Sequence, residues 1–373
     1  MAQKIIIGAI LLAVLFTAIA GANITSFFSL GVQKENTQFA IGALLPLSGK
    51  NATYGEEIKN AIELALDETT PPARNKIEVI YEDDASDPVK GVLGAKKLIN
   101  TDNVPIILGP WASSVVLAIA PIAEENKTIV LSEALAPAIT TSGDYIFRIQ
   151  PQAKYYAEKS AEYLLTKNET TSSILYVNND YGLALKNEFT KKYEENGGKV
   201  LNAETYNQND SDFRTQLEKI KETNPDALFI AGYQETTDAI KQANELGIET
   251  QIVAGPTFES QATLEKLGKL AESVVYPSHY DNSPENKKMQ EFIEKYKAKY
   301  KIEPGSYAPL MYDGTKIIAQ TVEECDRNTE CIKEALYKTS YEGIVGQITF
   351  DNNGDSITKV IMKTVRNNKF VTN

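Results

Sequence analysis

The chain carries few of the side chains that enzymes use for catalysis. His279 is the only histidine in 373 residues, which argues against a catalytic triad and a histidine-rich metal site. No spacing singles out a catalytic pair among the 50 acidic residues. The loop SGKNATYGEE lacks both GxGxxG and GxxxxGK[ST], the phosphate-binding patterns of nucleotide enzymes. We therefore predict a protein that is not an enzyme and that needs no metal and no cofactor.

Hydroxyl and aromatic side chains instead follow the ends of the predicted strands. They are Tyr54, Trp111, Ser113, Ser114, Tyr181 and Tyr233. In open α/β sheets, ligands bind beyond the carboxyl ends of the strands. Ser113 and Ser114 also open a predicted helix, whose free backbone N–H groups and positive dipole end favour a carboxylate. The pattern predicts a site for a small polar ligand. The alternative is that the serines only cap the helix and the tyrosines are ordinary surface residues.

Two series of alternating strands and helices must position these residues. The first series has the strands FAIGALLPL, KIEVIYEDD, VPIILGPW, TIVLSEA and YIFRI. The second has SSILYVNND, KVLNAETY, ALFIAGY, QIVAGPT and SVVYPSHY. Such continuous apolar strands are typical of a parallel sheet covered by helices on both faces. Two α/β units in one chain also predict a cleft between them, and such clefts are preferred ligand sites.

Several helices and the last strands are predicted from periodicity and capping residues. One helix is expected from Glu56 to about Thr70 and another from about Ser306 to Glu324. A third, capped by Ser283-Pro284, presents one apolar stripe, which consists of Met289, Phe292, Ile293, Tyr296 and Tyr300. The chain is expected to end with the strands VGQITFD and KVIMKTV.

The N-terminus predicts export. An uncharged apolar run extends from Ile5 to Ala22, and Ala18-Ile19-Ala20 has the form of a signal cleavage site. We expect a signal peptide or an uncleaved anchor and exclude residues 1–36 from the fold, so that any membrane contact is limited to this segment. Five glycosylation sequons agree with export; they begin at Asn23, Asn51, Asn126, Asn168 and Asn209. The net charge of −12 argues against nucleic acid.

The two cysteines predict a structural disulfide. Cys325 and Cys331 stand six residues apart across the polar stretch DRNTE. In an oxidising compartment they can close a small loop between two helices. No histidine lies nearby, so the pair makes a poor metal site.

A set of motifs runs in order along the chain: IGALLPLSGKNATYG, EDDASDP, ILGPWASS, IFRIQP, YVNNDYG, LFIAGY, PGSYAPLMYDG and VGQITFDNNGD. Together they resemble the type I solute-binding proteins of ABC importers, in particular the branched-chain amino-acid (Leu/Ile/Val) binding group. The resemblance implies two Rossmann-like α/β lobes joined by a three-crossing hinge. By analogy, lobe one is 38–149 with 282–343, and lobe two is 150–281 with 344–373.

The resemblance also assigns roles within the site. Ser113 matches the serine that binds the ligand carboxylate. Tyr54, Tyr181 and Tyr233 match aromatic residues that line the cleft. Trp111 and Tyr307 match positions that shape the side-chain pocket.

Two departures from the family pattern concern the ligand's ammonium group. The family's S-P-x-A-T-x-P segment reads SEALAP here, one residue shorter and without threonine, so Glu133 and Ala134 become candidate ligand-binding residues. The family's Gly-Pro-Glu, whose glutamate accepts the ammonium, ends in Thr257. A buried ammonium without a carboxylate partner costs several kcal/mol. Either Glu133 or Glu259 substitutes, or the ligand is an amide, urea or aromatic acid without an ammonium.

These expectations define a leading function and two rivals. The leading function is an extracytoplasmic, monomeric receptor that captures an amino acid or a related small molecule and is recognised by an ABC transporter permease. The second is a sensor of the same fold, which signals the presence of its ligand. The third is an enzyme on an α/β scaffold, which slow release of unchanged ligand would argue against.

Overall fold

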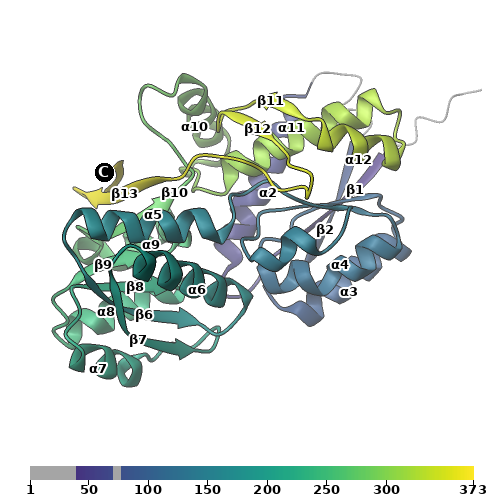
Figure 1. Ribbon diagram of the computed structural model, residues 1–373. Helices are drawn as coiled ribbons and strands as arrows, with labels where there is room; N and C mark the ends of the chain where they lie inside the picture. The colour runs from purple at the N-terminus through teal and green to yellow at the C-terminus, as the bar shows by residue number, and fades with distance from the viewer. Residues whose placement is uncertain (1–38, 70–76) are drawn as a thin grey trace, which may run out of the picture. The chain divides into compact units, whose positions relative to one another are not determined.

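The computed structural model describes residues 39–69 and 77–373 (Figure 1). The predicted export segment, with the sequon at Asn23, therefore lies outside the described residues. Within the described part of the chain, no helix is both long enough and apolar enough to cross a membrane.

Sheet one has five parallel strands in the order β2-β1-β3-β4-β5. They are β1 (Phe39–Leu45), β2 (Ile77–Asp83), β3 (Ile106–Leu108), β4 (Ile129–Ser132) and β5 (Ile146–Arg148). Helices lie on both sides of this sheet (Figure 1); they are α2 (Ala52–Asp67), α3 (Pro88–Asn100), α4 (Ser113–Glu125), α10 (Lys287–Tyr300), α11 (Ala308–Glu324) and α12 (Thr329–Tyr337). α3 packs on α4, and α2 packs on α11, from a distant part of the chain. We call this assembly lobe one.

Sheet two has seven strands in the order β14-β13-β10-β9-β8-β6-β7. They are β6 (Thr171–Val177), β7 (Lys199–Tyr206), β8 (Ala227–Ala231), β9 (Gln251–Ala254), β10 (Val275–Ser278), β13 (Ile361–Arg366) and β14 (Lys369–Thr372). The first five are parallel, whereas β13 and β14 add antiparallel. Its helices are α5 (Ala153–Thr166), α6 (Asp180–Glu195), α7 (Arg214–Glu222), α8 (Glu235–Glu245) and α9 (Gln261–Leu267). We call this assembly lobe two, and the predicted two-lobed α/β class is confirmed.

The chain passes between the two sheets three times, after β5, after β10 and before β13. A short hairpin of β11 (Ser340–Glu342) and β12 (Gln347–Thr349) precedes the third passage. That passage lies against the first, because the amide of Ser356 donates to the Arg148 carbonyl at 2.8 Å. The residue limits expected for the lobes stay a prediction.

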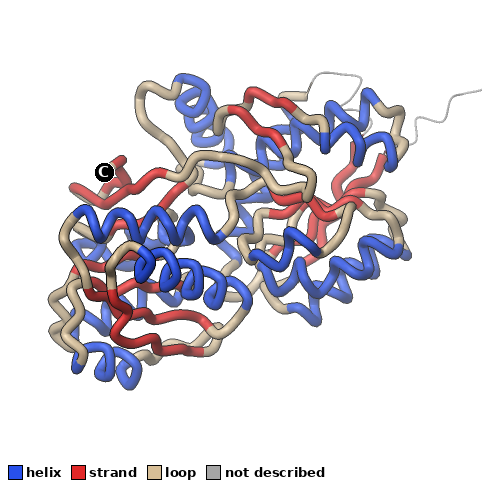
Figure 2. The backbone as a smooth tube through the Cα atoms, in the orientation of Figure 1, coloured by secondary structure: helices blue, strands red, loops and turns tan. Residues whose placement is uncertain are grey.

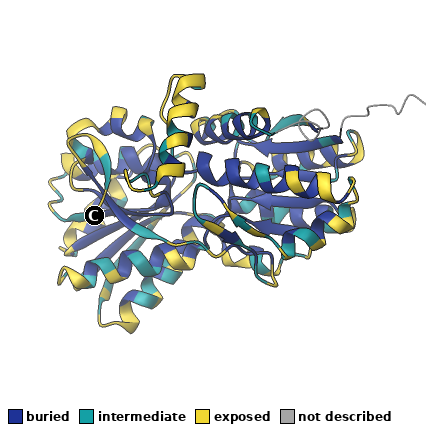
Figure 3. Cartoon of the chain, turned by 90° about the horizontal axis from the view of Figure 1, so that it is seen from above, coloured by how far each residue is buried: buried dark blue, intermediate teal, exposed yellow. Residues whose placement is uncertain are grey.

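The strands of both sheets form the core. Figure 2 shows the strands in red with the blue helices around them, and Figure 3 shows the strands mostly buried while the outward faces of the helices are exposed. The predicted stripe of α10 is confirmed in part. Met289, Phe292 and Tyr296 are buried in a cluster with α2 and α11, and Ile293 and Tyr300 pack against its edge.

Three local predictions need correction. α10 begins at Lys287 with Asn286 as its cap, because Ser283-Pro284 belongs to the preceding turn, in which the Asn286 amide donates to the Ser283 carbonyl. α2 begins at Ala52 instead of Glu56, which places Tyr54 in its first turn. The sequon at Asn51 is unsuited to a glycan, because its side chain is 2 % exposed and donates to Ser86 Oγ.

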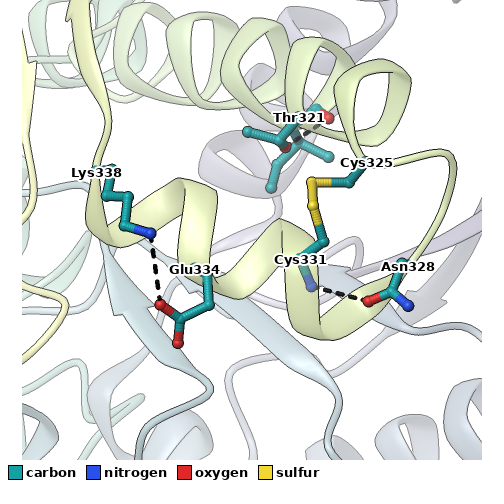
Figure 4. The surroundings of a disulfide bond; sticks show 7 residues. Thr321, Cys325, Asn328, Cys331, Glu334 and Lys338 are labelled. Atoms are coloured by element: carbon teal, nitrogen blue, oxygen red, sulfur yellow. Dashed lines mark hydrogen bonds and ion pairs between the residues drawn. A yellow bond between two sulfur atoms is a disulfide. The ribbon is translucent and has the colours of Figure 1, made fainter.

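The structure joins Cys325 and Cys331 in a disulfide between α11 and α12 (Figure 4). Cys325 follows α11, where its amide donates to the Thr321 carbonyl at 3.0 Å. Asn328 caps α12 by accepting from the amide of Cys331 at 2.9 Å. The disulfide therefore closes the turn between two helices, as the spacing predicts.

Candidate functional site

The candidate residues lie where each sheet reverses its strand order. In sheet one β1 and β3 are neighbours although β2 comes between them in sequence, and in sheet two the same holds for β6 and β8. The loops beyond two such strands diverge and leave a crevice that binds ligands in open α/β sheets. Tyr54 and Trp111 follow β1 and β3, and Tyr181 and Tyr233 follow β6 and β8. Each lobe thus presents an aromatic pair at its crevice.

The turn that carries Trp111 depends on a glycine. Gly109 has φ 87°, and a Cβ there would lie 2.3 Å from the carbonyl oxygen of Leu44. This close approach between the ends of β3 and β1 excludes a side chain. The position of Trp111 is therefore set by backbone packing.

Five rings form what we call the aromatic wall: Tyr54, Trp111, Tyr181, Tyr233 and Tyr307, all at most 4 % exposed. Tyr54 stacks on Trp111 at 4.5 Å between ring centroids, and Tyr181 stacks on Tyr233 at 4.6 Å. Trp111 contacts Tyr233 at 5.0 Å, which brings rings of the two lobes together. Tyr307 meets both lobe-one rings edge-on at 5.5 Å. The structure thus collects all five predicted aromatic residues in one place.

The polar tips of two of these tyrosines converge on Thr257. The Tyr54 hydroxyl donates to the Thr257 carbonyl at 2.9 Å, from lobe one to lobe two. The Tyr181 hydroxyl lies 3.4 Å from Thr257 Oγ1, which itself donates to the Gly232 carbonyl at 2.6 Å. Burial raises the pKa of Tyr54, Tyr181 and Tyr233. These hydroxyls therefore stay protonated; Tyr54 and Tyr181 donate, whereas Tyr233 accepts from Asn179 Nδ2 at 3.4 Å.

Ser113 is the first residue of α4, whose N-cap is Ala112. Its Oγ accepts from the amides of Leu135 and Ala136, both at 3.2 Å, so it does not cap its own helix. Among the described residues the hydroxyl proton has no recorded acceptor, and it remains available at the positive end of the helix. Ser114 is partly exposed beside it. This corner of lobe one suits an anionic group.

Glu133 and Ala134 are both 1 % exposed, in the segment whose amides bond to Ser113. Within the described part of the chain, neither carboxylate oxygen of Glu133 has a hydrogen-bond partner. Burial, and next the negative charge of Glu57, raise the pKa of Glu133 well above its ordinary value. A contact with the Met311 backbone acts in the opposite direction and lowers this pKa. Glu133 is thus a buried acid that no side chain of the described residues pairs.

Glu259, the other candidate for the ammonium, is already paired. It forms an ion pair with Lys363 Nζ and accepts from Ser278 Oγ at 2.6 Å. Lys363 is fully buried and also donates to the Tyr280 carbonyl at 3.1 Å and to Asn282 Oδ1 at 2.9 Å. This carboxylate is therefore committed within lobe two.

A chain of polar residues behind the wall was not anticipated. Tyr156 donates to His279 Nδ1 at 2.6 Å, and His279 Nε2–H donates to the Ser306 carbonyl at 2.7 Å, a tautomer that the carbonyl acceptor dictates. Gln150 Nε2 donates to the Tyr156 hydroxyl at 3.3 Å. Burial lowers the pKa of His279 to about 4, so the ring is neutral. Gln150 lies in the motif IFRIQP and Ser306 in PGSYAPLMYDG. Membership of these two motifs was the sequence signal that could have identified both residues.

The arrangement offers buried donors, acceptors and rings, which is what binding a small molecule requires. Both ring nitrogens of His279 are already in hydrogen bonds, one with the Tyr156 hydroxyl and one with the Ser306 carbonyl. Within residues 39–69 and 77–373, no cluster of three or more His, Cys, Asp or Glu side chains is suited to a metal ion.

Comparison with known proteins agrees with this geometry. The model of the periplasmic binding protein family matches residues 38–369. The Leu/Ile/Val-binding protein of Escherichia coli K12 is 25 % identical over 347 residues, which cover 90 % of this chain and 92 % of that protein.

Two solved structures share the fold. The branched-chain amino acid transporter substrate binding protein of Streptococcus pneumoniae, in complex with isoleucine, has a TM-score of 0.84 and 27 % identity, covering 90 % of this chain and 98 % of that one. An ABC transporter solute binding protein of R. palustris, in complex with benzoate, has a TM-score of 0.85, 19 % identity and coverages of 90 % and 95 %. The second likeness concerns the fold alone.

Proposed function

Because this chain belongs to the periplasmic binding protein family, we propose that it is the extracytoplasmic receptor of an ABC importer, and that it captures an amino acid or a related small carboxylate between its lobes. One observation carries the proposal. The residues at the two crevices meet across the lobes, through the rings of Trp111 and Tyr233 and the Tyr54–Thr257 hydrogen bond. A molecule held there touches both lobes at once.

Capture works by closure of the lobes. Further hydrogen bonds join the rims of the lobes. Lys50 Nζ donates to the Asp210 carbonyl at 3.2 Å, and Gln208 Nε2 donates to the Ser86 carbonyl at 3.2 Å. A ligand that contacts both lobes only when they are closed shifts the population toward the closed state. A permease that reads the closed shape then receives only loaded receptors.

The ligand carboxylate binds at the corner formed by Ser113 and the start of α4, and the aromatic wall surrounds the apolar part of the ligand. Ser113 supplies the hydroxyl proton, and the first amides of the helix supply further donors. Tyr54 and Tyr181 close over the ligand from the two lobes, and Thr257 sits between their hydroxyls. Ser114 and Ala134 line the same corner.

A second candidate ligand is an acid without an ammonium, such as benzoate. The threonine at position 257, where the resemblance expects a glutamate, favours it. The ring-rich wall also suits an aromatic acid.

The test is a pair of serine variants. Ser113→Ala removes a hydrogen bond to a charged group, which contributes roughly 1.5–3 kcal/mol, so affinity should fall about tenfold to a hundredfold. The matched control is Ser172→Ala. Ser172 is a buried serine at the amino end of β6, whereas the crevice lies beyond the carboxyl end of that strand. Calorimetry with the ligand identified by mass spectrometry of the purified protein gives the comparison. Equal affinity of the two variants would remove Ser113 from the site.

Transport and sensing need a separate experiment. Co-purification with a permease supports the importer, whereas co-purification with a signalling protein supports a sensor of the same fold.

The receptor is proposed to be monomeric, exported through its N-terminal segment, and oxidised at Cys325 and Cys331. Thiol titration of the exported protein under denaturing, non-reducing conditions should then find no free thiol.

A further inference from the structure

A group of buried oxygen atoms without partners lies behind the aromatic wall. Within the described residues these atoms are both carboxylate oxygens of Glu133, Oε1 of Gln150, and Oγ of Ser132 and Ser306. All four side chains are at most 1 % exposed. A buried polar atom without a hydrogen bond destabilises the fold. Several together indicate a partner that arrives from outside the chain.

These atoms share one neighbourhood. Tyr156 links Gln150 to His279, and His279 links onward to the Ser306 backbone. Glu133 lies near enough to Tyr156 and Tyr307 for a negative charge on it to raise the pKa of both phenols. Tyr307 in turn packs on Trp111 and Tyr54. The acceptor group therefore adjoins the site proposed above.

The fold supplies no cation to this neighbourhood. Among the described residues, the one charged side chain that shifts the pKa of Glu133 is Glu57, which is also acidic. Lys363 is held by Glu259, Asn282 and the Tyr280 carbonyl. A carboxylate isolated in this way is stable only if it is protonated or if a cation reaches it. Most of the free atoms are acceptors, so the missing partner is rich in N–H donors.

Glu133 is also close to the carboxylate corner. Ser113 Oγ bonds to the amides of Leu135 and Ala136, two and three residues after Glu133. That length of chain spans about 10 Å at most. One small molecule can place a carboxylate at Ser113 and a second polar group at Glu133.

We propose that Glu133 binds the ammonium group of the ligand, with Ser306, Ser132 and Gln150 as further acceptors, so that the ligand is an amino acid. This inference rests on the proposed function and selects between its two ligand classes. A primary ammonium has three donors, which match a carboxylate together with a neighbouring hydroxyl or amide oxygen. Glu259 does not take this role, because Lys363 and Ser278 already occupy its oxygens.

The experiment compares amino acids with their deaminated analogues, using the purified full chain and calorimetry. The probes are the twenty common L-amino acids, the deaminated analogue of the amino acid that binds best (4-methylpentanoate for leucine, 3-methylpentanoate for isoleucine, 3-phenylpropanoate for phenylalanine) and benzoate. The amino acid that binds best should exceed its deaminated analogue by at least about tenfold to a hundredfold, the cost of losing a charged hydrogen bond. This comparison needs no variant, so it holds even if a variant fails to fold.

Two variants then locate the effect. Glu133→Gln should remove the preference for the amino acid and leave the affinity for its analogue within about threefold of the wild type. Asp84→Asn is the matched control, a fully buried carboxyl of lobe one whose pKa burial raises to about 7; it should keep the preference.

Each contrary outcome has a definite meaning. If the deaminated acids bind as tightly as the amino acids, or if Glu133→Gln keeps the preference, the inference is overturned and the proposed receptor stands with an acid as its ligand. If neither the twenty amino acids nor any of the acids, benzoate included, bind, the proposed function falls as well.

Discussion

Two loops of this protein each carry a buried glutamate and treat it differently. In lobe two, the loop after β9 holds Glu259 against Lys363 and Ser278. In lobe one, the loop after β4 buries Glu133 equally well, yet no side chain of the described residues bonds to its oxygens. The pair in lobe two is complete without a ligand, and the acid in lobe one is not. Burial alone therefore does not mark a binding residue; Glu133 differs from Glu259 in that neither of its oxygens is bonded by a side chain.

Arg148→Met should have the largest effect, because this side chain supports the lobe-one loop directly. Its guanidinium donates to the carbonyls of Leu135 and Ala136 at 3.1 and 2.9 Å and pairs with Asp355 in the third passage between the lobes. Breaking a buried ion pair costs about 3–5 kcal/mol. Urea unfolding should show this loss, and ligand affinity should fall too because the loop loses its support. Unchanged affinity would mean that the loop is held by other contacts.

Lys363→Met should destabilise the protein by a similar amount, about 3–5 kcal/mol, because it leaves Glu259 buried without its cation. In contrast to Arg148→Met, ligand affinity should stay within about threefold of the wild type. Adding Glu259→Leu should restore much of the stability. A large loss of affinity in the single variant would show that Glu259 belongs to the site, and the contrast between the loops would fail.

Glu133→Gln should leave the free energy of unfolding unchanged or raise it by about 1 kcal/mol at neutral pH. Burial raises the pKa of this acid, so the folded wild type bears a cost that an uncharged amide avoids. Urea unfolding without ligand is the measurement. A loss of more than about 2 kcal/mol would show that Glu133 stabilises the fold and would contradict the prediction.

Proton release on binding is the smallest expected effect. Burial raises the pKa of Glu133 in the free protein, and an ammonium beside it lowers that pKa again. Binding of the preferred amino acid should therefore release up to about one proton, and its affinity should rise with pH while Glu133 titrates.

The groups that face Glu133 are Glu57 from α2, Tyr156 from α5 and Tyr307 before α11. The pKa of Glu57 is itself raised to about 8 by burial, so it belongs to the same titration. Calorimetry at one pH in phosphate and in Tris separates the heat of proton release from the heat of binding. Equal heats in both buffers would contradict the prediction, and Glu133→Gln should release fewer protons than the wild type.

The sequence alone determined the two α/β series, because apolar strands and helix periodicity are local patterns that the final fold keeps. It also placed Tyr54, Trp111, Ser113, Tyr181 and Tyr233 after strand ends, since parallel strands carry their loops to one edge of a sheet. The helix starts at Ala52 and Lys287 were mispredicted, because turns and caps near a helix start compete over a few residues.

The tertiary structure alone decided which glutamate is free. Glu133 and Glu259 read alike in the sequence, as acids beside the family's ammonium-binding positions. Lys363 stands 104 residues after Glu259, and only the antiparallel addition of β13 beside β10 brings it to that carboxylate. The chain Gln150–Tyr156–His279–Ser306 likewise joins segments from both sides of the hinge. Pairing of buried charges depends on distance in space, which residue types and local spacing do not contain.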